Sequence, residues 1–244
     1  MSKKSNLVIL RQAGSTQDEA YKIALDGAPE GVAVITTNQT YGRGRTGRSW
    51  ISPPGKNLAL SLILRPQCYP EKAPLYGLMA SVAAASAVEH FTGRVAHLKW
   101  PNDVLIEGKK IAGVLSQARI RGSLIEFLII GLGLNINCTE SDFPNELRKT
   151  RTSMFELTSR TFDIIEVGET FISDLKELYI GCCLGEFRHV LDLWSEKWIH
   201  KGFVVERDGI RGIAEGIDDS GALEVRRNDG SLVKISSGEI NFSE

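Results

Sequence analysis

The chain has 244 residues, of which 42% are hydrophobic and 24% are charged. These fractions are close to the averages for soluble globular proteins, so fibrous and intrinsically disordered classes are excluded. The formal net charge of −1 argues against a protein that coats nucleic acid or an acidic membrane surface.

Strands and helices are predicted to alternate over roughly the first ninety residues. Apolar, β-rich runs at 6–10, 32–37 and 58–64 predict three strands. A serine at the start of 15–26 is a good helix cap, and a helix is expected there. The alanine-rich segment 74–93 predicts a buried helix that ends on a glycine. Glycines and paired prolines between the second and third strands predict a loop.

The middle of the chain predicts a run of strands followed by helices. Strands are expected around Leu98 and at 104–106, 111–120 and 125–130. The sequence E-G-K-K between the second and third of these is typical of a tight hairpin. From 163 to 198 the apolar spacing becomes helical, and Gly185 predicts a break between two helices.

The residues after 202 form short alternating apolar segments with turn signals at D-D-S-G and N-D-G. This pattern predicts a small SH3-like β-barrel. The expected fold class is therefore α/β (α+β), a mixed central sheet with flanking helices and a small C-terminal barrel. The expected domains are 1–198 and 199–244.

The cysteines indicate a reducing compartment. They form no C-x-x-C pair, Cys182 and Cys183 are adjacent, and the N-terminal residues do not resemble a signal peptide. The longest uncharged run, 73–88, is too short and too rich in Ala and Ser to span a membrane. We therefore expect a cytoplasmic protein with reduced thiols and no membrane partner.

The most unusual part of the sequence is a glycine–arginine loop. Residues 31–70 contain five basic side chains and no acidic one. Gly42, Gly44 and Gly47 match G-x-G-x-x-G, the dinucleotide-binding fingerprint. That motif needs a helix directly after it, and Pro53 and Pro54 forbid one here. A dinucleotide site is therefore excluded.

The loop sequence alone leaves three interpretations of Arg43, Arg45 and Arg48 open. They could be solvated loop side chains, which is the commonest case, or an arm for the minor groove of DNA. They could also lie on a glycine-hinged loop that folds over a small phosphorylated ligand, since arginine binds phosphate oxygens in bidentate fashion. The acidic balance of the remaining chain argues against the DNA arm.

Two further polar clusters have ordinary explanations beside functional ones. In K-W-P-N-D (99–103) the Asn-Asp pair, taken alone, is more often a turn. Lys110 follows this motif and precedes an apolar strand, and a lysine in such a place is more often a snorkelling surface residue. In G-L-G-L-N-I-N (131–137) strand glycines indicate close packing or a ligand against the chain. Asn135 there needs a partner, either structural or a bound substrate. No G-x-S-x-G motif occurs, so a Ser-His-Asp hydrolase has little support, and the lack of a P-loop motif excludes a P-loop ATPase.

Taken together and in order, these motifs resemble those of the biotin–protein ligases, also called biotin–[acetyl-CoA-carboxylase] ligases. The motifs are S-T-Q at 15–17, Gln39 followed by G-R-G-R-T-G-R-S-W, then K-W-P-N-D, G-K-K-I-A-G-V-L and G-L-G-L-N-I-N. The similarity extends over nearly the whole chain. It implies a class II synthetase-like catalytic fold that uses biotin, ATP and Mg²⁺ and modifies a biotin carboxyl carrier protein domain.

The resemblance also implies a ligase-only form, because S-T-Q begins too early for the DNA-binding domain of the family's larger members, so no nucleic-acid partner is expected. Family members often form homodimers. A lipoate- or octanoate-transferring relative is the alternative, and a DNA-binding arginine-arm protein is a more distant one.

Residue roles follow from the same resemblance. Catalytic roles are implied for Lys110, Arg45 and Asp103, with Lys110 on the biotin carboxylate and the acyl phosphate, and Asp103 near the attacking lysine or the metal. The residues implied to hold the ureido and thiophane end of biotin are Ser15, Thr16, Gln17 and Gln39. The other residues implied to bind ligand are Gly42, Arg43, Gly44, Trp50, Lys99, Trp100, Asn102, Gly113, Leu115, Gly131, Gly133 and Asn135. No metal ligand is assigned.

Overall fold

The central sheet has seven strands in the order β1-β2-β5-β9-β8-β7-β6 in the computed structural model, which describes residues 6–238 and 240–243. Its strands are β1 (Leu7–Ile9), β2 (Ala33–Thr36), β5 (Leu58–Leu64), β6 (His97–Lys99), β7 (Asp103–Ile106), β8 (Lys109–Arg121) and β9 (Leu124–Leu134). β1 pairs with β2 in parallel, and the other neighbours pair antiparallel. The central strands are covered on both faces, so they form the nearly continuous apolar runs from which they were predicted.

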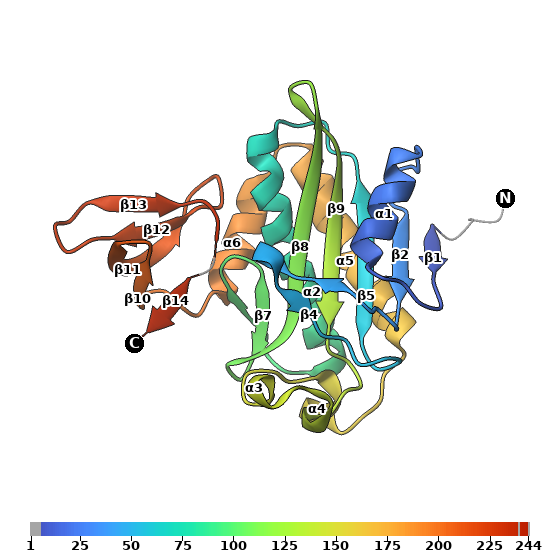
Figure 1. Cartoon of the computed structure of the whole chain (residues 1–244). Coiled ribbons are helices and arrows are strands. Elements are labelled where there is room, and N and C mark those ends of the chain that lie inside the picture. The colour runs from blue at the N-terminus through green and yellow to red at the C-terminus, as the bar shows by residue number, and fades with distance from the viewer. Residues whose placement is uncertain (1–5, 239, 244) are drawn as a thin grey trace.

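Side-chain alternation along β5 divides the interior into two layers. Leu58, Leu60 and Leu62 face the larger core, which three helices cover. Those helices are α2 (Ala73–Thr92), α5 (Ile164–Cys183) and α6 (Phe187–Lys197). Ile63 faces the opposite side and packs with Ala20 of α1 (Thr16–Leu25). α1 has only ten residues, so part of this second face is left for other elements (Figure 1).

The predicted helices begin and end close to where they were expected, and glycine conformations explain two of the ends. Gly93 ends α2 in the left-handed region, at φ 65°. Gly185, at φ 85°, separates α5 from α6. In this region an L side chain would be strained, so glycine is favoured at both points. Ser15 occupies the N-cap position of α1, but its side chain accepts no capping hydrogen bond from the described part of the helix.

Three pieces of regular structure were not predicted. The glycine–arginine loop contains a two-stranded hairpin of β3 (Gly42–Arg43) and β4 (Ser49–Trp50), joined by the 3₁₀ turn η1 (Arg45–Gly47). Two short helices, α3 (Asn145–Arg148) and α4 (Met154–Thr158), follow β9. All are too short to give a periodic signal. The remaining 3₁₀ turns are η2 (Pro70–Lys72) and η3 (Glu140–Asp142).

The C-terminal residues form a separate antiparallel sheet in the order β13-β12-β11-β10-β14, beside α6 (Figure 1). Its strands are β10 (Val204–Arg207), β11 (Ile210–Ile217), β12 (Leu223–Arg226), β13 (Leu232–Ile235) and β14 (Asn241–Ser243). The Trp100 indole N–H donates to the carbonyl of Gly221 at 3.0 Å, which ties this sheet to the body. The predicted fold class is confirmed.

None of the helices in the described residues has the length and apolar character needed to cross a membrane.

Candidate active site

A cavity of about 320 Å³ lies on the face of the sheet that α1 leaves uncovered. The strand register places small residues in a row across it, with Gly133 of β9 opposite both Ala59 of β5 and Gly113 of β8. Gly113 in turn pairs with Asp103 of β7. Since paired residues share a face, this row forms a shallow floor that ends at a carboxylate.

Trp50 of the β3–β4 hairpin lies over that floor. A Cβ at position 133 would be 2.6 Å from the Trp50 indole Nε1 and 2.7 Å from its Cδ2, far inside van der Waals contact. A Cβ at position 113 would be 3.2 Å from the Trp50 ring and from the Lys110 Nζ. The two glycines therefore make room for an aromatic ring and a lysine side chain.

One end of the cavity is lined by uncharged polar groups that bond to one another. The Ser61 hydroxyl on β5 lies 2.9 Å from the Thr16 hydroxyl oxygen and 3.2 Å from the Gln17 Oε1, and it can donate its one hydrogen to either. The Gln39 Oε1 accepts from the Thr16 backbone N–H at 2.9 Å. These groups sit at the N-terminus of α1, and Ser15, Thr16 and Gln17 are all buried. The arrangement suits a neutral polar ligand group that both donates and accepts hydrogen bonds.

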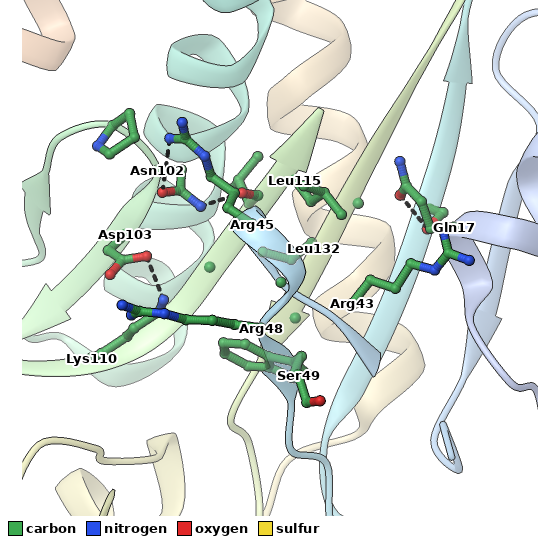
Figure 2. Close-up of a pocket in the computed structure, with 18 of the residues that line it drawn as sticks. Gln17, Arg43, Arg45, Arg48, Ser49, Asn102, Asp103, Lys110, Leu115 and Leu132 are labelled. Carbon is green, nitrogen blue, oxygen red and sulfur yellow. Dashed lines mark hydrogen bonds and ion pairs between the residues drawn. The ribbon is translucent and has the colours of Figure 1, made fainter. Parts of the chain in front are cut away.

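The three arginines of the hairpin point to different parts of the cavity, as Figure 2 shows. Arg43 lies toward Gln17 and forms an ion pair with Asp18 at 3.0 Å. Arg45 points toward Asn102, whose Oδ1 accepts from its guanidinium at 3.5 Å. Arg48 extends to the pair formed by Lys110 and Asp103. Left-handed conformations at Thr46 and Gly47 turn the chain between these side chains.

Lys110 is held from several sides. Its ammonium forms an ion pair with Asp103 and lies 5.6 Å from the centroid of the Trp50 ring. Its backbone N–H donates to the Thr150 carbonyl at 2.9 Å, and its carbonyl accepts from the Thr152 N–H at 3.1 Å. The lysine charge is therefore fixed above the glycine floor and does not snorkel to solvent.

The charges around the cavity are strongly unbalanced. Among the described residues that line it, one is acidic, Asp103, and six are cationic. The cationic residues are Arg43, Arg45, Arg48, Lys99, Lys110 and Arg151. Such a site attracts an anion that carries several charges, because cations gathered around one cavity add up to a local positive potential.

Most of the residues predicted from the sequence line this cavity. They are Ser15, Thr16, Gln17, Gln39, Arg43, Gly44, Arg45, Trp50, Lys99, Trp100, Asn102, Asp103, Lys110, Gly113, Leu115, Gly131 and Gly133.

Two predicted residues lie outside the cavity lining. Gly42 lines an adjoining groove, where it leaves room for the Trp50 carbonyl. The Asn135 Oδ1 accepts from the Asn57 amide at 3.1 Å, and its Nδ2 donates to the Thr152 carbonyl at 3.0 Å. Asn135 thus has structural partners, one of the two possibilities that its sequence left open, and the ligand-binding role implied by the resemblance stays a prediction.

Sequence reasoning missed several lining residues. Ser61 gave a signal that could have been used, since it is the one hydroxyl within the apolar strand L-A-L-S-L-I-L. Arg151, Ile240 and Asn241 gave none. They reach the cavity only through tertiary packing.

Known proteins resemble this chain in sequence and in structure. It matches the model of the Biotin/lipoate A/B protein ligase family over residues 9–135 and that of the Biotin protein ligase C terminal domain over residues 204–243. It is 35% identical to the Bifunctional ligase/repressor BirA of Bacillus subtilis (strain 168), over 93% of this chain and 71% of that protein. It is 32% identical to the Biotin--[acetyl-CoA-carboxylase] ligase of Paracoccus denitrificans, over 96% of this chain and 99% of that protein. The solved structure of biotin protein ligase from Aquifex aeolicus in complex with biotin and ATP matches with a TM-score of 0.83 and 28% identity, over 98% of this chain and 99% of that one.

Proposed function

The chain belongs to the biotin/lipoate A/B protein ligase family, and we propose that it is a biotin–protein ligase that activates biotin with ATP and transfers it to a lysine of a biotin carboxyl carrier domain. The observation that carries the proposal is one cavity with a neutral hydrogen-bonding end, a glycine floor and a strongly cationic end. Biotin is a neutral polar bicycle on an aliphatic tail that ends in a carboxylate. The bicycle suits the hydrogen-bonding end of the cavity and the carboxylate suits its cationic end.

In the first step, an oxygen of the biotin carboxylate attacks the α-phosphorus of ATP. The bond from that phosphorus to the bridging oxygen of the β-phosphate breaks, and pyrophosphate leaves with the electron pair. Lys110 and Arg45 would hold the carboxylate and the α-phosphate together, because both side chains line the cationic end. Fixed cations also stabilise the charge that develops on the phosphate and on the leaving group.

In the second step, the neutral amine of an acceptor lysine attacks the acyl carbon of biotinyl-5′-AMP. An amide bond forms, the acyl–oxygen bond breaks, AMP leaves, and the amine loses a proton. The ion pair between Asp103 and Lys110 would orient the lysine toward the acyl phosphate. The Trp50 ring would cover the adenylate and exclude water, which protects the mixed anhydride from hydrolysis.

Mg²⁺ is part of the proposal as a companion of ATP. The described residues contain no cluster of three His, Cys, Asp or Glu side chains able to hold a metal by themselves. A single carboxylate fits the usual mode of this ion, which binds one or two carboxylates together with substrate phosphates. Asp103 would be that carboxylate. When bound, Mg²⁺ would neutralise charge on the phosphate oxygens.

Residues 1–198 would bind biotin and ATP, and residues 199–244 would act as a C-terminal unit that reaches the site through Ile240 and Asn241, which line the cavity. A cytoplasmic location is supported by the cysteines of the described residues, all of which are free thiols. Homodimer formation stays a prediction.

The test is incubation with biotin, MgATP and a purified carrier domain, followed by intact-mass measurement of that domain. Biotin ligation adds the mass of one biotin less one water and requires ATP. Parallel reactions with lipoate and octanoate decide the alternative within the family, and an adduct with either acid but none with biotin would replace the proposal. No pyrophosphate release with any of the three acids would refute ligase activity.

A further inference from the structure

Arg151 lies in the cavity although its stretch of sequence gives no functional signal. It sits between α3 and α4, in a segment that runs beside Lys110. The two backbone hydrogen bonds of Lys110 go to the residues on either side, Thr150 and Thr152. The backbone of Arg151 is thus fixed next to the lysine, and its side chain lines the same cavity.

The surroundings of Arg151 leave its charge poorly compensated. Burial lowers the pKa of its guanidinium, Asp103 opposes that effect, and the like charge of Arg48 adds to it. An arginine side chain nevertheless stays protonated in proteins, so the cost of burial has to be met by an anion. Asp103, the acidic side chain among the described lining residues, already forms an ion pair with Lys110. The Arg151 guanidinium forms no hydrogen bond or ion pair with another side chain in the part of the chain that the structure describes.

We infer that Arg151 binds phosphate oxygens of ATP in the adenylation step, beside Lys110. The inference rests on the proposed function and deepens it. A guanidinium presents several N–H groups in one plane and matches two phosphate oxygens at once. The like charges of Arg151 and Arg48 repel each other, and a polyphosphate that reaches both would remove that repulsion. Arg151 lies at the end that holds Lys110 and Asp103, away from the neutral group around Ser61.

The experiment compares two variants with a matched control. Arg151→Met keeps most of the side-chain length and removes the charge, whereas Arg151→Lys keeps the charge and loses the planar fork. Lys149→Met is the control, because Lys149 lies two residues away, carries the same charge and is exposed. Pyrophosphate release with biotin and varied MgATP gives kcat and KM for ATP. Quenching of tryptophan fluorescence gives the Kd for biotin without nucleotide, and thermal unfolding reports folding.

Arg151→Met should lower kcat/KM for ATP by about 10- to 100-fold, the loss typical of a hydrogen bond to a charged group. The Kd for biotin should change by less than about twofold, Arg151→Lys should recover part of the lost activity, and Lys149→Met should match the wild type. If Arg151→Met does not fold, Arg151→Lys alone tests the inference. Loss of the bidentate contact with phosphate oxygens must raise the KM for ATP.

Two results would overturn the inference while leaving the proposed function intact. One is a wild-type kcat/KM for ATP in a folded Arg151→Met protein. The other is an equal loss of biotin and ATP binding, which would mean that Arg151 only supports the position of Lys110. A wild-type protein that releases no pyrophosphate would refute the proposed function, and this inference with it.

Discussion

Replacing Gly133 with alanine tests whether the glycine floor is there to seat Trp50. The added Cβ would lie 2.7 Å from the Trp50 Cδ2, in the middle of the indole and not at a flexible end. Carbon atoms in contact are about 3.5–4.0 Å apart, so the ring must move by about 1 Å. A displacement of about 1 Å in a binding site can cost about 100-fold in rate. We therefore expect kcat/KM for biotin to fall by about 100-fold.

The assay is pyrophosphate release with varied biotin and saturating MgATP. Gly216→Ala is the matched control, since Gly216 lies in strand β11 and its added Cβ would meet no described atom within 4 Å. Overpacking should also destabilise Gly133→Ala by about 1–3 kcal/mol, measured by denaturant unfolding. The control should be near wild type in both assays.

A double-mutant cycle decides the cause of the loss. Trp50→Leu will itself lower activity, but it removes the ring that the new methyl group strikes. Gly133→Ala should then cost less than about threefold in the Trp50→Leu background, since residues in contact are not additive. A full 100-fold cost in that background would refute the reasoning, because the methyl group would then act on the ligand or the backbone directly.

Three other predictions concern charge, pH and thiols. Lys110→Met should slow pyrophosphate release by about 10²–10³-fold in rapid-quench measurements, and a loss below about tenfold would remove Lys110 from the charge-stabilising role. Burial and the nearby Lys99 lower the pKa of His200 to about 4. An unfolded histidine has a pKa of about 6.5, so between these values the unfolded chain binds a proton that the folded chain does not, and stability falls as pH falls. His200→Phe should reduce the difference in unfolding free energy between pH 7 and pH 4.5 by about 2 kcal/mol, and an unchanged difference would contradict this. Cys183 is exposed, whereas burial raises the pKa of Cys182 to about 12, so a thiol reagent should modify Cys183 in the folded protein and leave Cys182 until unfolding.

The strands and long helices were predictable because each has its own local signal. The apolar run of β5 was expected at 58–64 and forms over Leu58–Leu64. The helix ending at Gly93 was found from its alanine content and its terminal glycine. The hairpin of the glycine–arginine loop gave no such signal. Its strands have two residues each, and what orders them is the contact of Trp50 with the sheet below.

The site was predictable where motifs are contiguous and not where the fold brings distant segments together. The arginine loop and K-W-P-N-D could be recognised as units. The structural partner of Asn135 could not be identified from the sequence, because Asn57 lies far away along the chain. Arg151 was not predicted as a site residue because it belongs to no motif. It reaches the cavity because its segment pairs with Lys110.

The pairing register of β7, β8 and β9 places the glycines of the site beside its charged residues. Gly133 and Gly113 are 20 positions apart in sequence, yet they face each other across β8 and β9, and the same row ends at Asp103. A floor without side chains lets Lys110 and Trp50 lie flat over the sheet, which brings cations from the hairpin, β8 and the α3–α4 segment around one volume. A net charge of −1 for the chain is therefore compatible with a strongly cationic cavity, because the fold concentrates a few charges that composition averages away.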